Sequence, residues 1–498
     1  MNYKKIEKRV QSMFDNCELD NDIISTKISK ENVQRLMDYQ IVHTLNLLIS
    51  FIKNQVVLDG SSTGTGKTYT SICVCKELGL RPLIICPLSI TSVWKSVCDY
   101  FDVHPIAIVN YEMIRTGKIK TKIKDQIKFD ENDKNNENNE NNKNNDLDKI
   151  LKIVDGKYEW NFSKNTLVIM DEVHKCKNKN SLNGQLLISL KNKVKLLMLS
   201  ATVADKPENF NVFGYMLGFY KNISKSRNWI SSIIRDDNNR LDLKTSTLYE
   251  KLYPEKGARM SMDDIGIKFP KNHISVTCYT LNEKDQQEIN AYYQHIQNKK
   301  ELNNEHLSVT TILKCRQKIE FLKISIIVEL IKKYLEIGKS IVVFVNFLNT
   351  LNGLEKVLKR TGLEYSSVQG GQSLEQRDIE INKFQANNTR IIICTMQSGS
   401  QSISLHDIHG NAPRVSLILP SFSSIDLIQA FGRIYRVGLK TPAIQKIILC
   451  DDVYEKLICE KIKEKLQFNI KLAENDTQNK VTKDLLKMFD NNNLEDLW

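Results

Sequence analysis

The sequence STGTGKT at residues 62–68 has the residue types and the spacing of a loop that binds a phosphate chain. Gly64 and Gly66 allow the backbone to curl, so that several N–H groups can point at one anion. A helix that begins near Lys67 would add the positive end of its dipole. A turn rich in glycine, serine and threonine could contain the same residues, but the strand-like run at residues 55–58 and the helical pattern after the loop favour phosphate binding.

The residues of this loop would act in different ways. Lys67 should reach the β- and γ-phosphates of a nucleotide, and the hydroxyl of Thr68 should ligate Mg²⁺. The backbone that surrounds the phosphates would belong to Thr63, Gly64, Thr65 and Gly66. One position departs from the usual pattern, because Ser61 stands where a phosphate loop commonly has its first glycine.

The sequence DEVH at residues 171–174 directly follows a continuous apolar run. The loop after such a strand faces the crevice in which open α/β sheets bind ligands. There Asp171 could hold Mg²⁺ through a water molecule, opposite Thr68, and Glu172 could polarise an attacking water as a general base. His174 would couple the phosphate site to the neighbouring part of the protein. A solvated charged turn is the alternative, and the position of this sequence behind the strand and after the phosphate loop argues against it.

A third group of chemically interesting residues lies in the sequence QAFGRIYRVG at residues 429–438, where Arg433 and Arg436 are three positions apart. On a helix this spacing puts both side chains on one face. A permanently charged, planar guanidinium suits the transition state of phosphoryl transfer. Alone, such a pair is most often a solvated basic face. Its order after the other two motifs favours an arginine finger that assists hydrolysis.

The elements that must position these residues follow an α/β pattern. Helical and strand-like patterns alternate from residue 33 to residue 115, and strand-like runs resume between residues 166 and 200. A second alternation begins near residue 338 and ends near residue 450. We therefore predict an α/β protein of two units, each a mainly parallel sheet with helices on both faces, plus helical insertions.

Composition breaks suggest where these units begin and end. All residues from 130 to 145 are Asn, Asp, Glu or Lys and offer nothing to bury. The region between the units is mostly helical or irregular, with one strand-like run at residues 273–280. The predicted division is an N-terminal segment (1–30), a first unit (31–220) with a disordered Asn-rich insertion at about 117–150, a helical linker (221–335), a second unit (336–465) and a polar tail (466–498).

The chain has 498 residues, and its 71 Lys and Arg against 59 Asp and Glu give a net charge of +12. This moderate surplus fits a polyanion such as nucleic acid, although many enzymes without such a partner carry as much. No apolar run is long enough for a transmembrane helix, and the charged N-terminal sequence lacks the apolar core of a signal peptide. The 11 cysteines form no CxxC pair, so we expect neither a disulfide framework nor a zinc site, and an intracellular location in nucleus, cytoplasm or virion.

Further short motifs join these three into an ordered set that resembles the Swi/Snf-like helicases and translocases of superfamily 2. The resemblance extends over about residues 33–450. In chain order the motifs are Tyr39-Gln40, Cys86-Pro87-Leu88-Ser89 with Trp94-Lys95, Asn110-Tyr111-Glu112, DEVHKCKN at 171–178, Ser200-Ala201-Thr202, NVFGYMLGF at 211–219, FVNF at 344–347, Gln369-Gly370-Gly371, and the stretch at 429–438.

One segment departs from the family pattern. Where these proteins usually have a glycine-rich motif close to GGxGxNL, this chain has SGSQSISLHD at residues 398–407. This form, with the HGNAPR that follows it soon after, resembles diverged Swi/Snf-like helicases of large DNA viruses.

The resemblance implies two RecA-like lobes that bind ATP and Mg²⁺. It implies that Gln40 reads the adenine and that the second lobe supplies Arg433 and Arg436. Coupling roles are implied for His174, Ser200, Thr202 and Gln429. Nucleic-acid contacts, made mainly to the backbone, are expected from Ser89, Trp94, Ser398 and Ser402, although Trp94 could also belong to the core with its apolar helix neighbours.

The sequence leaves three functions open. The leading hypothesis is an ATP-dependent translocase on double-stranded DNA. The first alternative is a DExH-type helicase that unwinds RNA or DNA, which the SAT sequence at residues 200–202 favours because other branches of superfamily 2 use that form. The second alternative is an ATP-gated binding module in a viral transcription or packaging complex. We expect no membrane partner, and any recruitment specificity would come from residues 205–335, the tail or a partner protein.

Overall fold

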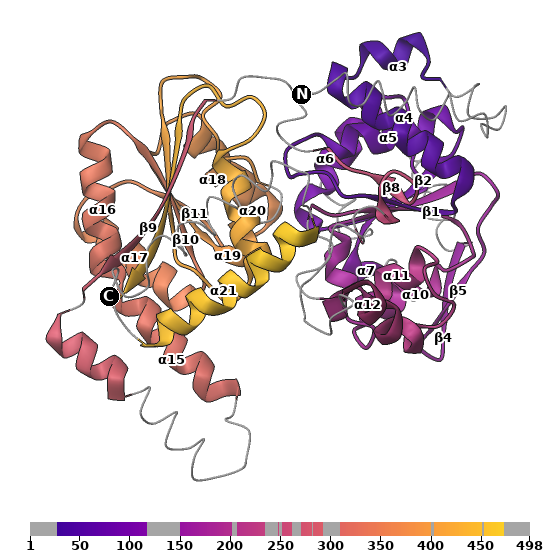
Figure 1. The fold of residues 1–498 in the computed structure, drawn as a ribbon. Coiled ribbons are helices and arrows are strands. Elements are labelled where there is room, and N and C mark those ends of the chain that lie inside the picture. Colours follow the sequence, from indigo (N-terminus) through magenta and orange to yellow (C-terminus); the bar gives the residue numbers. More distant parts are fainter. Residues whose placement is uncertain are drawn as a thin grey trace. The chain divides into compact units, whose positions relative to one another are not determined.

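The structure is a computed structural model of the chain. It describes residues 27–116, 150–201, 207–234, 248, 251–260, 270–280, 282–291, 309–399, 403–450 and 453–472. These residues fall into two compact units, one formed mainly by residues up to Ile267 and the other mainly by residues from Lys268 onward (Figure 1). The predicted pair of α/β units is confirmed.

The first unit is built on a sheet with the strand order β3-β2-β6-β7-β1-β8, in which each neighbouring pair is parallel. All residues of β1 and β6 are buried, as expected for continuous apolar strands in a parallel sheet that is covered on both faces. The strands of this unit are β1 (Val56–Asp59), β2 (Arg81–Cys86), β3 (Ala107–Asn110), β6 (Thr166–Asp171), β7 (Lys195–Leu199) and β8 (Gly257–Ala258), with a separate hairpin of β4 (Leu151–Val154) and β5 (Lys157–Trp160).

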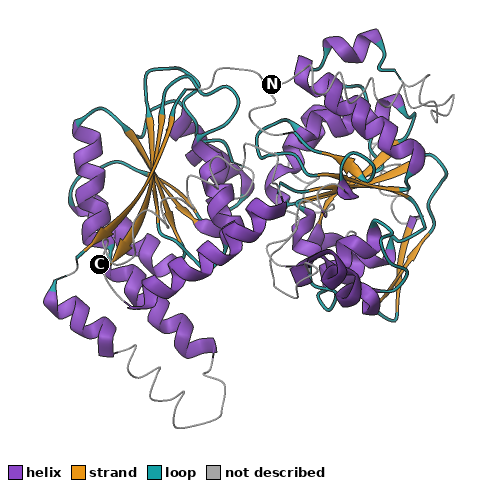
Figure 2. Cartoon of the chain, in the orientation of Figure 1, coloured by secondary structure: helices purple, strands orange, loops and turns teal. Residues whose placement is uncertain are grey.

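Helices cover both faces of this first sheet (Figures 1 and 2). On one face, Leu47 and Phe51 from α4, Ile72 from α5 and Trp94 from α6 pack into a single apolar cluster with strand residues such as Ile169. The helices α7, α10, α11 and α12 lie on the other face (Figure 1). The helices of the first unit are α3 (Lys30–Gln34), α4 (Asp38–Lys53), α5 (Lys67–Glu77), α6 (Thr91–Tyr100), α7 (Tyr111–Thr116), α10 (Leu182–Ser189), α11 (Asn211–Met216) and α12 (Ser226–Ile234), with 3₁₀ turns η1 (Leu88–Ile90), η3 (Val173–Cys176), η4 (Pro207–Phe210) and η5 (Ile223–Lys225).

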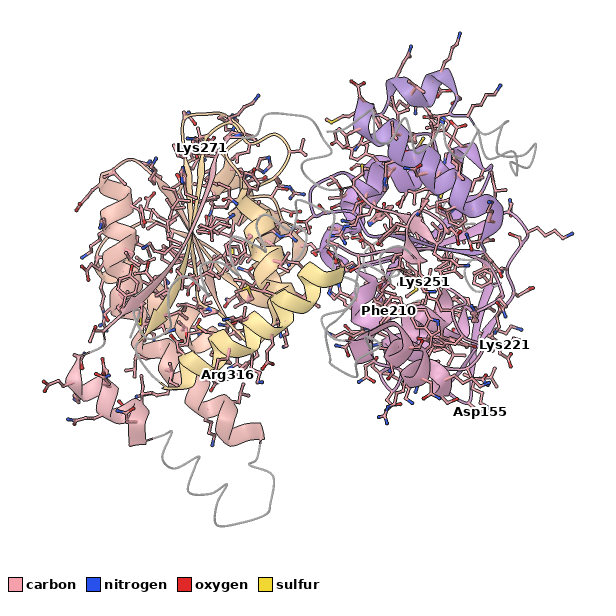
Figure 3. The ribbon with its side chains drawn as sticks, in the orientation of Figure 1. Asp155, Phe210, Lys221, Lys251, Lys271 and Arg316 are labelled. Carbon is pink, nitrogen blue, oxygen red and sulfur yellow. The ribbon has the colours of Figure 1, made fainter. Side chains whose placement is uncertain are left out.

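The hairpin of β4 and β5 is antiparallel and lies outside the main sheet. Its two-residue turn consists of Asp155 and Gly156, which both have positive φ angles (49° and 72°), as the tight turns of hairpins require. Asp155 is labelled in Figure 3. The indole N–H of Trp160 donates to Oγ of Ser189 on α10 (2.8 Å), which holds the hairpin against the unit.

Strand β8 completes the first sheet beside β1. The pairing continues past the strand, because the N–H of Ser62 donates to the carbonyl of Met260 (2.8 Å). Gly257 lies so close to β1 that a Cβ atom there would be 1.9 Å from the carbonyl oxygen of Leu58. Only glycine fits this edge without a shift of the backbone.

The second unit has a sheet with the strand order β11-β12-β10-β13-β14-β9, again parallel in each described pair. Its strands are β9 (Asn272–Tyr279), β10 (Ser340–Val345), β11 (Ser366–Val368), β12 (Ile391–Thr395), β13 (Arg414–Ile418) and β14 (Ala443–Cys450). Its helices are α15 (Val309–Leu322), α16 (Ile324–Glu336), α17 (Leu348–Arg360), α18 (Leu374–Gln385), α19 (Met396–Gly399), α20 (Ser424–Ile434) and α21 (Val453–Leu472). Among the described helices of both units, none has the length and apolar composition needed to span a membrane.

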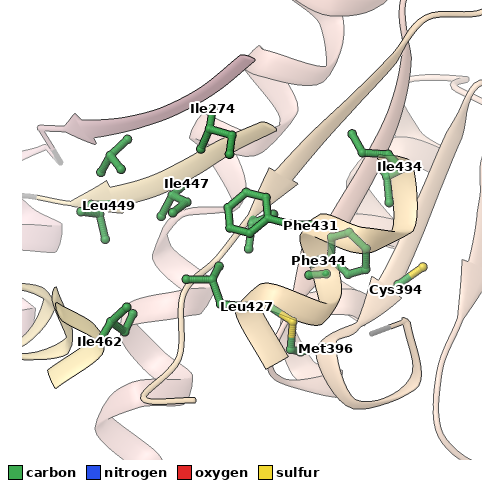
Figure 4. Close-up of a cluster of buried hydrophobic side chains, with 14 of the residues drawn as sticks. Ile274, Phe344, Cys394, Met396, Leu427, Phe431, Ile434, Ile447, Leu449 and Ile462 are labelled. Atoms are coloured by element: carbon green, nitrogen blue, oxygen red, sulfur yellow. The ribbon is translucent and has the colours of Figure 1, made fainter. Parts of the chain in front are cut away.

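The strand β10 divides its side chains between two cores. Ile341, Val343 and Val345 pack with the apolar faces of α16 and α17. Val342 and Phe344 point to the other face and pack with α18, α20 and α21. Figure 4 shows part of this second cluster, including Phe344, Leu427, Phe431, Ile434, Ile447 and Ile462.

Between the two sheets, the structure differs from the predicted helical linker at residues 221–335. Residues 257–258 belong to the first sheet, and residues 272–279 pair along their whole length with β14 as an edge strand of the second sheet. The strand-like run at residues 273–280 is therefore confirmed as a strand. Buried Ile274 and Val276 alternate with more exposed residues, and this pattern suits a strand at the edge of a sheet.

The ends of the chain and its insertion are only partly described. The N-terminal segment up to residue 26 and the Asn-rich insertion at residues 117–149 lie outside the described residues. The predicted polar tail from residue 466 differs from the structure, because α21 continues to Leu472. Buried side chains spaced along that helix, Ile458, Ile462 and Leu466, keep it on the core.

Replacing Gly257 by Ala tests the packing of β8 against β1. The added methyl group must displace either β8 or the Leu58 carbonyl, so we expect the free energy of unfolding of the first unit to fall by about 1–3 kcal/mol. Urea denaturation followed by circular dichroism measures this. Gly370→Ala is the matched control, because nothing lies within 4 Å of a Cβ built there. Equal effects of the two substitutions would contradict the close pairing of β8.

Candidate nucleotide site

The phosphate loop connects the end of β1 to the start of α5. Gly64 and Gly66 both have positive φ angles (81° and 87°), so the chain curls in the way that the sequence predicts. Gly66 is also the N-cap of α5, which directs the first backbone N–H groups of that helix to the loop. A Cβ on Gly66 would lie 2.2 Å from Nε2 of Gln40. This glycine is therefore required both by its backbone conformation and by a close neighbour.

Lys67 lies on the first turn of α5 and is folded over the loop. Its ammonium group donates to the carbonyl of Ser61 (2.8 Å) and to the carbonyl of Ser62 (2.9 Å). Thr68 is next to it and is half-buried. The loop thus presents curled backbone, a lysine and a hydroxyl at one helix N-terminus, which is the donor set that a phosphate chain with a divalent cation needs.

Gln40 from α4 contacts the same loop. Its side-chain carbonyl accepts from the N–H of Met37 (3.0 Å), and its amide donates to the carbonyl of Thr65 (3.3 Å). The side chain is buried. The structure thus places Gln40 against the phosphate loop, and contact with an adenine base stays a prediction.

The acidic pair stands where β6 ends. Asp171 is the last residue of the strand, and Glu172 has a left-handed backbone (φ 53°, ψ 46°) that turns the chain at once into the 3₁₀ helix η3. This conformation is uncommon for a residue with a side chain. Such backbone strain persists where the surrounding structure demands it, often at functional sites.

Asp171 is buried and held by three neighbours. Its Oδ1 accepts from the N–H of Glu172 (2.8 Å) and its Oδ2 from the indole N–H of Trp94 (3.1 Å). The hydroxyl of Tyr111 donates to the Asp171 carbonyl (2.7 Å). These bonds fix both the carboxylate and the backbone at the end of β6.

The charge state of Asp171 links the acidic pair to the phosphate loop. Burial, followed by the negative charge of Glu172, raises the pKa of Asp171 to about 6, against the opposing effects of Lys67 and of the Trp94 hydrogen bond. Lys67 and Asp171 therefore act on one another although they are far apart in the sequence. A buried carboxylate next to a second one provides a place for a cation.

His174 lies between Glu172 and Ser200, and a coupling role for the two residues stays a prediction. Nδ1 of His174 is 3.2 Å from Oε2 of Glu172 and 3.3 Å from Oγ of Ser200. The N–H of Ser200 in turn donates to the carbonyl of Asp59 at the end of β1 (3.1 Å). Thr202, the other residue of this motif that we singled out, lies outside the described residues.

The arginine pair belongs to the second unit, and one detail differs from the prediction. The helix α20 ends at Ile434 because Tyr435 takes an extended conformation, so Arg436 lies beyond the helix. The two guanidinium groups still meet, because each donates to the carbonyl of Ile403 at 3.2 Å. Arg433 is buried and also donates to the carbonyl of Gln429 (3.1 Å). Burial lowers the pKa of Arg436.

The segment that replaces the usual glycine-rich motif is organised by a side chain. The buried carboxylate of Asp407 accepts from the backbone N–H groups of His409 (3.1 Å), Gly410 (2.9 Å) and Ala412 (3.3 Å). It also accepts from the hydroxyl of Thr441 (2.8 Å), which follows the arginine pair. These bonds hold the pKa of Asp407 below its usual value although burial alone would raise it. Asp407 thereby ties this loop to the chain that carries the arginines.

The structure divides the residues expected to contact nucleic acid. The hypothesis is wrong for Trp94, which is fully buried on the inner face of α6 and hydrogen-bonded to Asp171. Ser89 and Ser398 are half-buried, and the carbonyl of Ser398 accepts from Arg377. Ser402 lies outside the described residues. Contacts of Ser89 and Ser398 with nucleic acid stay predictions.

Comparisons with protein families agree with the two units. The family described as "Type III restriction enzyme, res subunit" matches residues 33–205, and the family described as "Helicase conserved C-terminal domain" matches residues 322–438. The chain is 33% identical over 467 residues to "Putative ATP-dependent RNA helicase L364" of Acanthamoeba polyphaga mimivirus, which covers 89% of this chain and 84% of that protein.

Two further comparisons give weaker similarities. The chain is 29% identical over 138 residues to the human protein "DNA excision repair protein ERCC-6-like", which covers 27% of this chain and 11% of that protein. Among solved structures, the Sulfolobus solfataricus SWI2/SNF2 ATPase core in complex with dsDNA shares 16% sequence identity, with a TM-score of 0.35, and covers 91% of this chain and 96% of its own.

Replacing Trp94 by Phe removes the N–H that Asp171 accepts and keeps most of the ring. Because that hydrogen bond favours the charged carboxylate, its loss should raise the pKa of Asp171 further, and near neutral pH protons would compete more strongly with a Mg²⁺ ion that this carboxylate holds. We expect the Mg²⁺ concentration for half-maximal ATP hydrolysis to rise about three- to tenfold at pH 6.5 and much less at pH 8.5.

The control for this substitution is Trp160→Phe, which also removes an indole N–H but on the hairpin. It should leave the Mg²⁺ requirement unchanged. If Trp94→Phe instead weakens hydrolysis equally at both pH values, Trp94 acts through packing and not through the charge of Asp171.

Proposed function

The chain belongs to the superfamily 2 helicases, as a diverged Swi/Snf-like member related to helicases of large DNA viruses, and from that premise we propose that it uses ATP to move along double-stranded DNA. It is an ATP-hydrolysing helicase-type enzyme that binds nucleic acid. The proposal concerns the finer points: the roles of individual residues, the metal and the kind of nucleic acid.

We propose that the first unit holds ATP through the phosphate loop. Lys67 would move from the carbonyls that it contacts to the phosphate chain, and the N-terminus of α5 would face the same anion. Thr68 and Asp171 would hold Mg²⁺, and Asp171, whose pKa is raised by burial and by Glu172, fits a group that gains from a cation. When bound, Mg²⁺ would neutralise charge on the phosphate oxygens.

Glu172 is the proposed general base. Its left-handed backbone aims the residue away from the line of β6, and the contact of its Oε2 with Nδ1 of His174 fixes the carboxylate. His174 and Ser200 would then transmit a change in the contacts of the Glu172 carboxylate to the end of β7. The observation that carries the ATPase assignment is geometric: the curled loop with Lys67 at the start of α5 follows β1, and Asp171 and Glu172 stand at the end of β6 in the same parallel sheet.

Arg433 and Arg436 are the proposed arginines that stabilise charge on the transferring phosphoryl group. Both guanidinium groups share the carbonyl of Ile403. To contact a phosphoryl group, each guanidinium would have to break its hydrogen bond to this carbonyl or use its other N–H groups. Gln429 would connect this pair to the rest of α20, since its carbonyl accepts from Arg433.

Double-stranded DNA is favoured as the substrate by the Swi/Snf-like order of motifs and by the similarity to a protein that is named for DNA excision repair. A second candidate, unwinding of RNA, is favoured by the name of the mimivirus relative and by the SAT form of the motif at residues 200–202. An ATP-gated module in a viral transcription or packaging complex is the third candidate.

The first experiment is the steady-state ATPase rate of the purified protein alone and with duplex DNA, single-stranded DNA or RNA. We expect duplex DNA to stimulate the rate most strongly. Stimulation only by RNA would favour the unwinding helicase, and no response to any of the three would favour a module gated by partners. Glu172→Gln serves as the blank, because loss of the base should lower the rate by about 10²–10⁴-fold while ATP still binds. The exposed Glu159→Gln on the hairpin is its matched control.

Arg433→Ala should lower kcat by about 10³-fold or more, with little change in the KM for ATP, because the guanidinium acts on charge that develops in the transition state. Steady-state kinetics with saturating nucleic acid measure both parameters. Arg360→Ala, an exposed arginine at the end of α17, controls for the loss of a positive charge. A rise in KM without a change in kcat would show that Arg433 serves binding and not hydrolysis.

A further inference from the structure

Three polar side chains form a buried cluster behind the phosphate loop. They are His43 on α4, Asp59 at the end of β1 and Ser61 in the loop, and their exposed fractions are 2%, 0% and 0%. Nε2 of His43 lies 3.0 Å from Oδ2 of Asp59 and 3.2 Å from Oγ of Ser61. The proposed roles of the loop residues do not account for this cluster.

The cluster has the residue types of a hydrolase triad but not its geometry. In a triad, the two ring nitrogens of the histidine contact the acid and the nucleophile separately, so that the ring can transfer a proton. Here a single nitrogen of His43 faces both Asp59 and Ser61. Since Ser61 is also fully buried, its hydroxyl is not exposed to a substrate, and we assign the cluster a structural purpose.

Ser61 shows this structural purpose, because its N–H, its hydroxyl and its carbonyl each take part in a hydrogen bond. Its N–H donates to Oδ1 of Asp59 (2.9 Å), and its Oγ accepts from the N–H of Met260 (2.9 Å) beside His43. Its carbonyl accepts from the ammonium group of Lys67 (2.8 Å). Ser61 stands where phosphate loops commonly have a glycine, so side-chain bonds here restrict a position that is usually free to vary.

The cluster also connects the loop to α4 at a second point. Gln40 and His43 are three residues apart on that helix and therefore share a face. Gln40 donates to the carbonyl of Thr65 at one end of the loop, whereas His43 contacts Ser61 at the other end. The helix α4 thus contacts the loop on both sides of its curl.

Charge supports the same arrangement. Burial alone would raise the pKa of Asp59, but His43, Lys67 and a side-chain hydrogen bond with Ser61 outweigh it, and the pKa is lowered. Asp59 is therefore a buried negative charge close enough to act on the lysine that is expected to meet the phosphate chain.

We propose that His43 and Asp59 are positioning residues that hold the first half of the phosphate loop and thereby the starting position of Lys67, so that they set nucleotide affinity without touching the base. This inference rests on the proposed function, because it assumes that the loop binds ATP. Its signature is a loss of affinity that is the same for every nucleotide, in contrast to the base-dependent loss expected at Gln40.

The experiment measures equilibrium dissociation constants of the full chain for ADP, ATP and GTP, without nucleic acid, by isothermal titration calorimetry. His43→Leu, which keeps the volume and removes the donor, should raise all three constants by a common factor of about ten. His43→Gln, which keeps an N–H near the position of Nε2, should recover most of the affinity. Ser50→Ala is the control, because Ser50 is buried on the same helix and bonds to the carbonyl of Pro254 (3.1 Å), far along α4 from the loop.

His43→Leu could fail to fold, because it leaves the buried Asp59 without its partner. A double-mutant cycle with Ser61→Ala therefore provides a second test. Ser61→Ala should raise all three constants by a common factor, because it removes the hydroxyl that faces Nε2 of His43, and unchanged constants in this variant would overturn the inference. The double variant His43→Leu/Ser61→Ala should lose no more affinity than His43→Leu alone, because both single substitutions remove the same link. Unchanged constants in His43→Leu, equal losses for His43→Leu and His43→Gln, or fully additive losses in the cycle would each overturn the inference. Failure of the unaltered protein to bind any nucleotide would instead overturn the proposed function.

Discussion

The ammonium group of Lys67 acts on two buried carboxylates at once, Asp59 at the end of β1 and Asp171 at the end of β6. Because the strands are parallel and only β7 separates these two, both carboxyl ends meet at one edge of the sheet, about 10 Å apart. Burial disfavours the charged form of both groups. For Asp59, His43 and then Lys67 outweigh burial and the pKa is lowered, whereas for Asp171 burial and Glu172 outweigh Lys67 and the pKa is raised to about 6. Glu172 adds a further negative charge, so this edge of the first unit suits the Mg²⁺ ion that we propose there. The phosphate loop, the acidic pair and the buried cluster behind the loop all place charged groups at this edge of the sheet, and Lys67 acts on the carboxylates on both sides.

Both places where the chain departs from the glycine pattern of its family are organised in the same way. At the start of the phosphate loop, Asp59 accepts from the backbone N–H of Ser61. In the altered segment of the second unit, Asp407 accepts from three backbone N–H groups and from the hydroxyl of Thr441. Asp59 thus accepts from one backbone N–H and Asp407 from three, which a freer, glycine-rich loop would leave to water or to a ligand. Loops held in this way have a fixed conformation and adapt less to a ligand.

Much of the fold could be predicted because it rests on local patterns. Continuous apolar runs predict the strands of a covered parallel sheet, and Gly64 and Gly66 predict the curled loop. Other features depend on contacts between distant segments. The hydrogen bond from Trp94 to Asp171 joins residues that no spacing rule connects, and an apolar helix face predicts burial but not a polar partner. The two-residue strand β8 is too short to leave a periodic pattern. The end of α20 before Arg436 follows from the extended backbone of Tyr435, which the helical spacing does not reveal. His43 was likewise missed, because a single histidine on an apolar helix face carries no signal of its partners.

The position of β8 has a consequence for how the chain is made. The strand that completes the first sheet, together with Met260, whose N–H and carbonyl both bond to the start of the phosphate loop, lies about 200 positions after β1. A ribosome adds roughly 5–20 residues per second, so β1 and its loop must wait on the order of 10–40 s before their edge partner exists. During that time the first unit can collapse around its central strands, but its nucleotide loop stays unfinished. The second unit repeats the order in reverse, since β9 emerges first and must wait for β14 to receive it. Each sheet is therefore closed by its most distant segment in sequence, and the capacity to bind nucleotide should appear late in synthesis, after the framework that surrounds it.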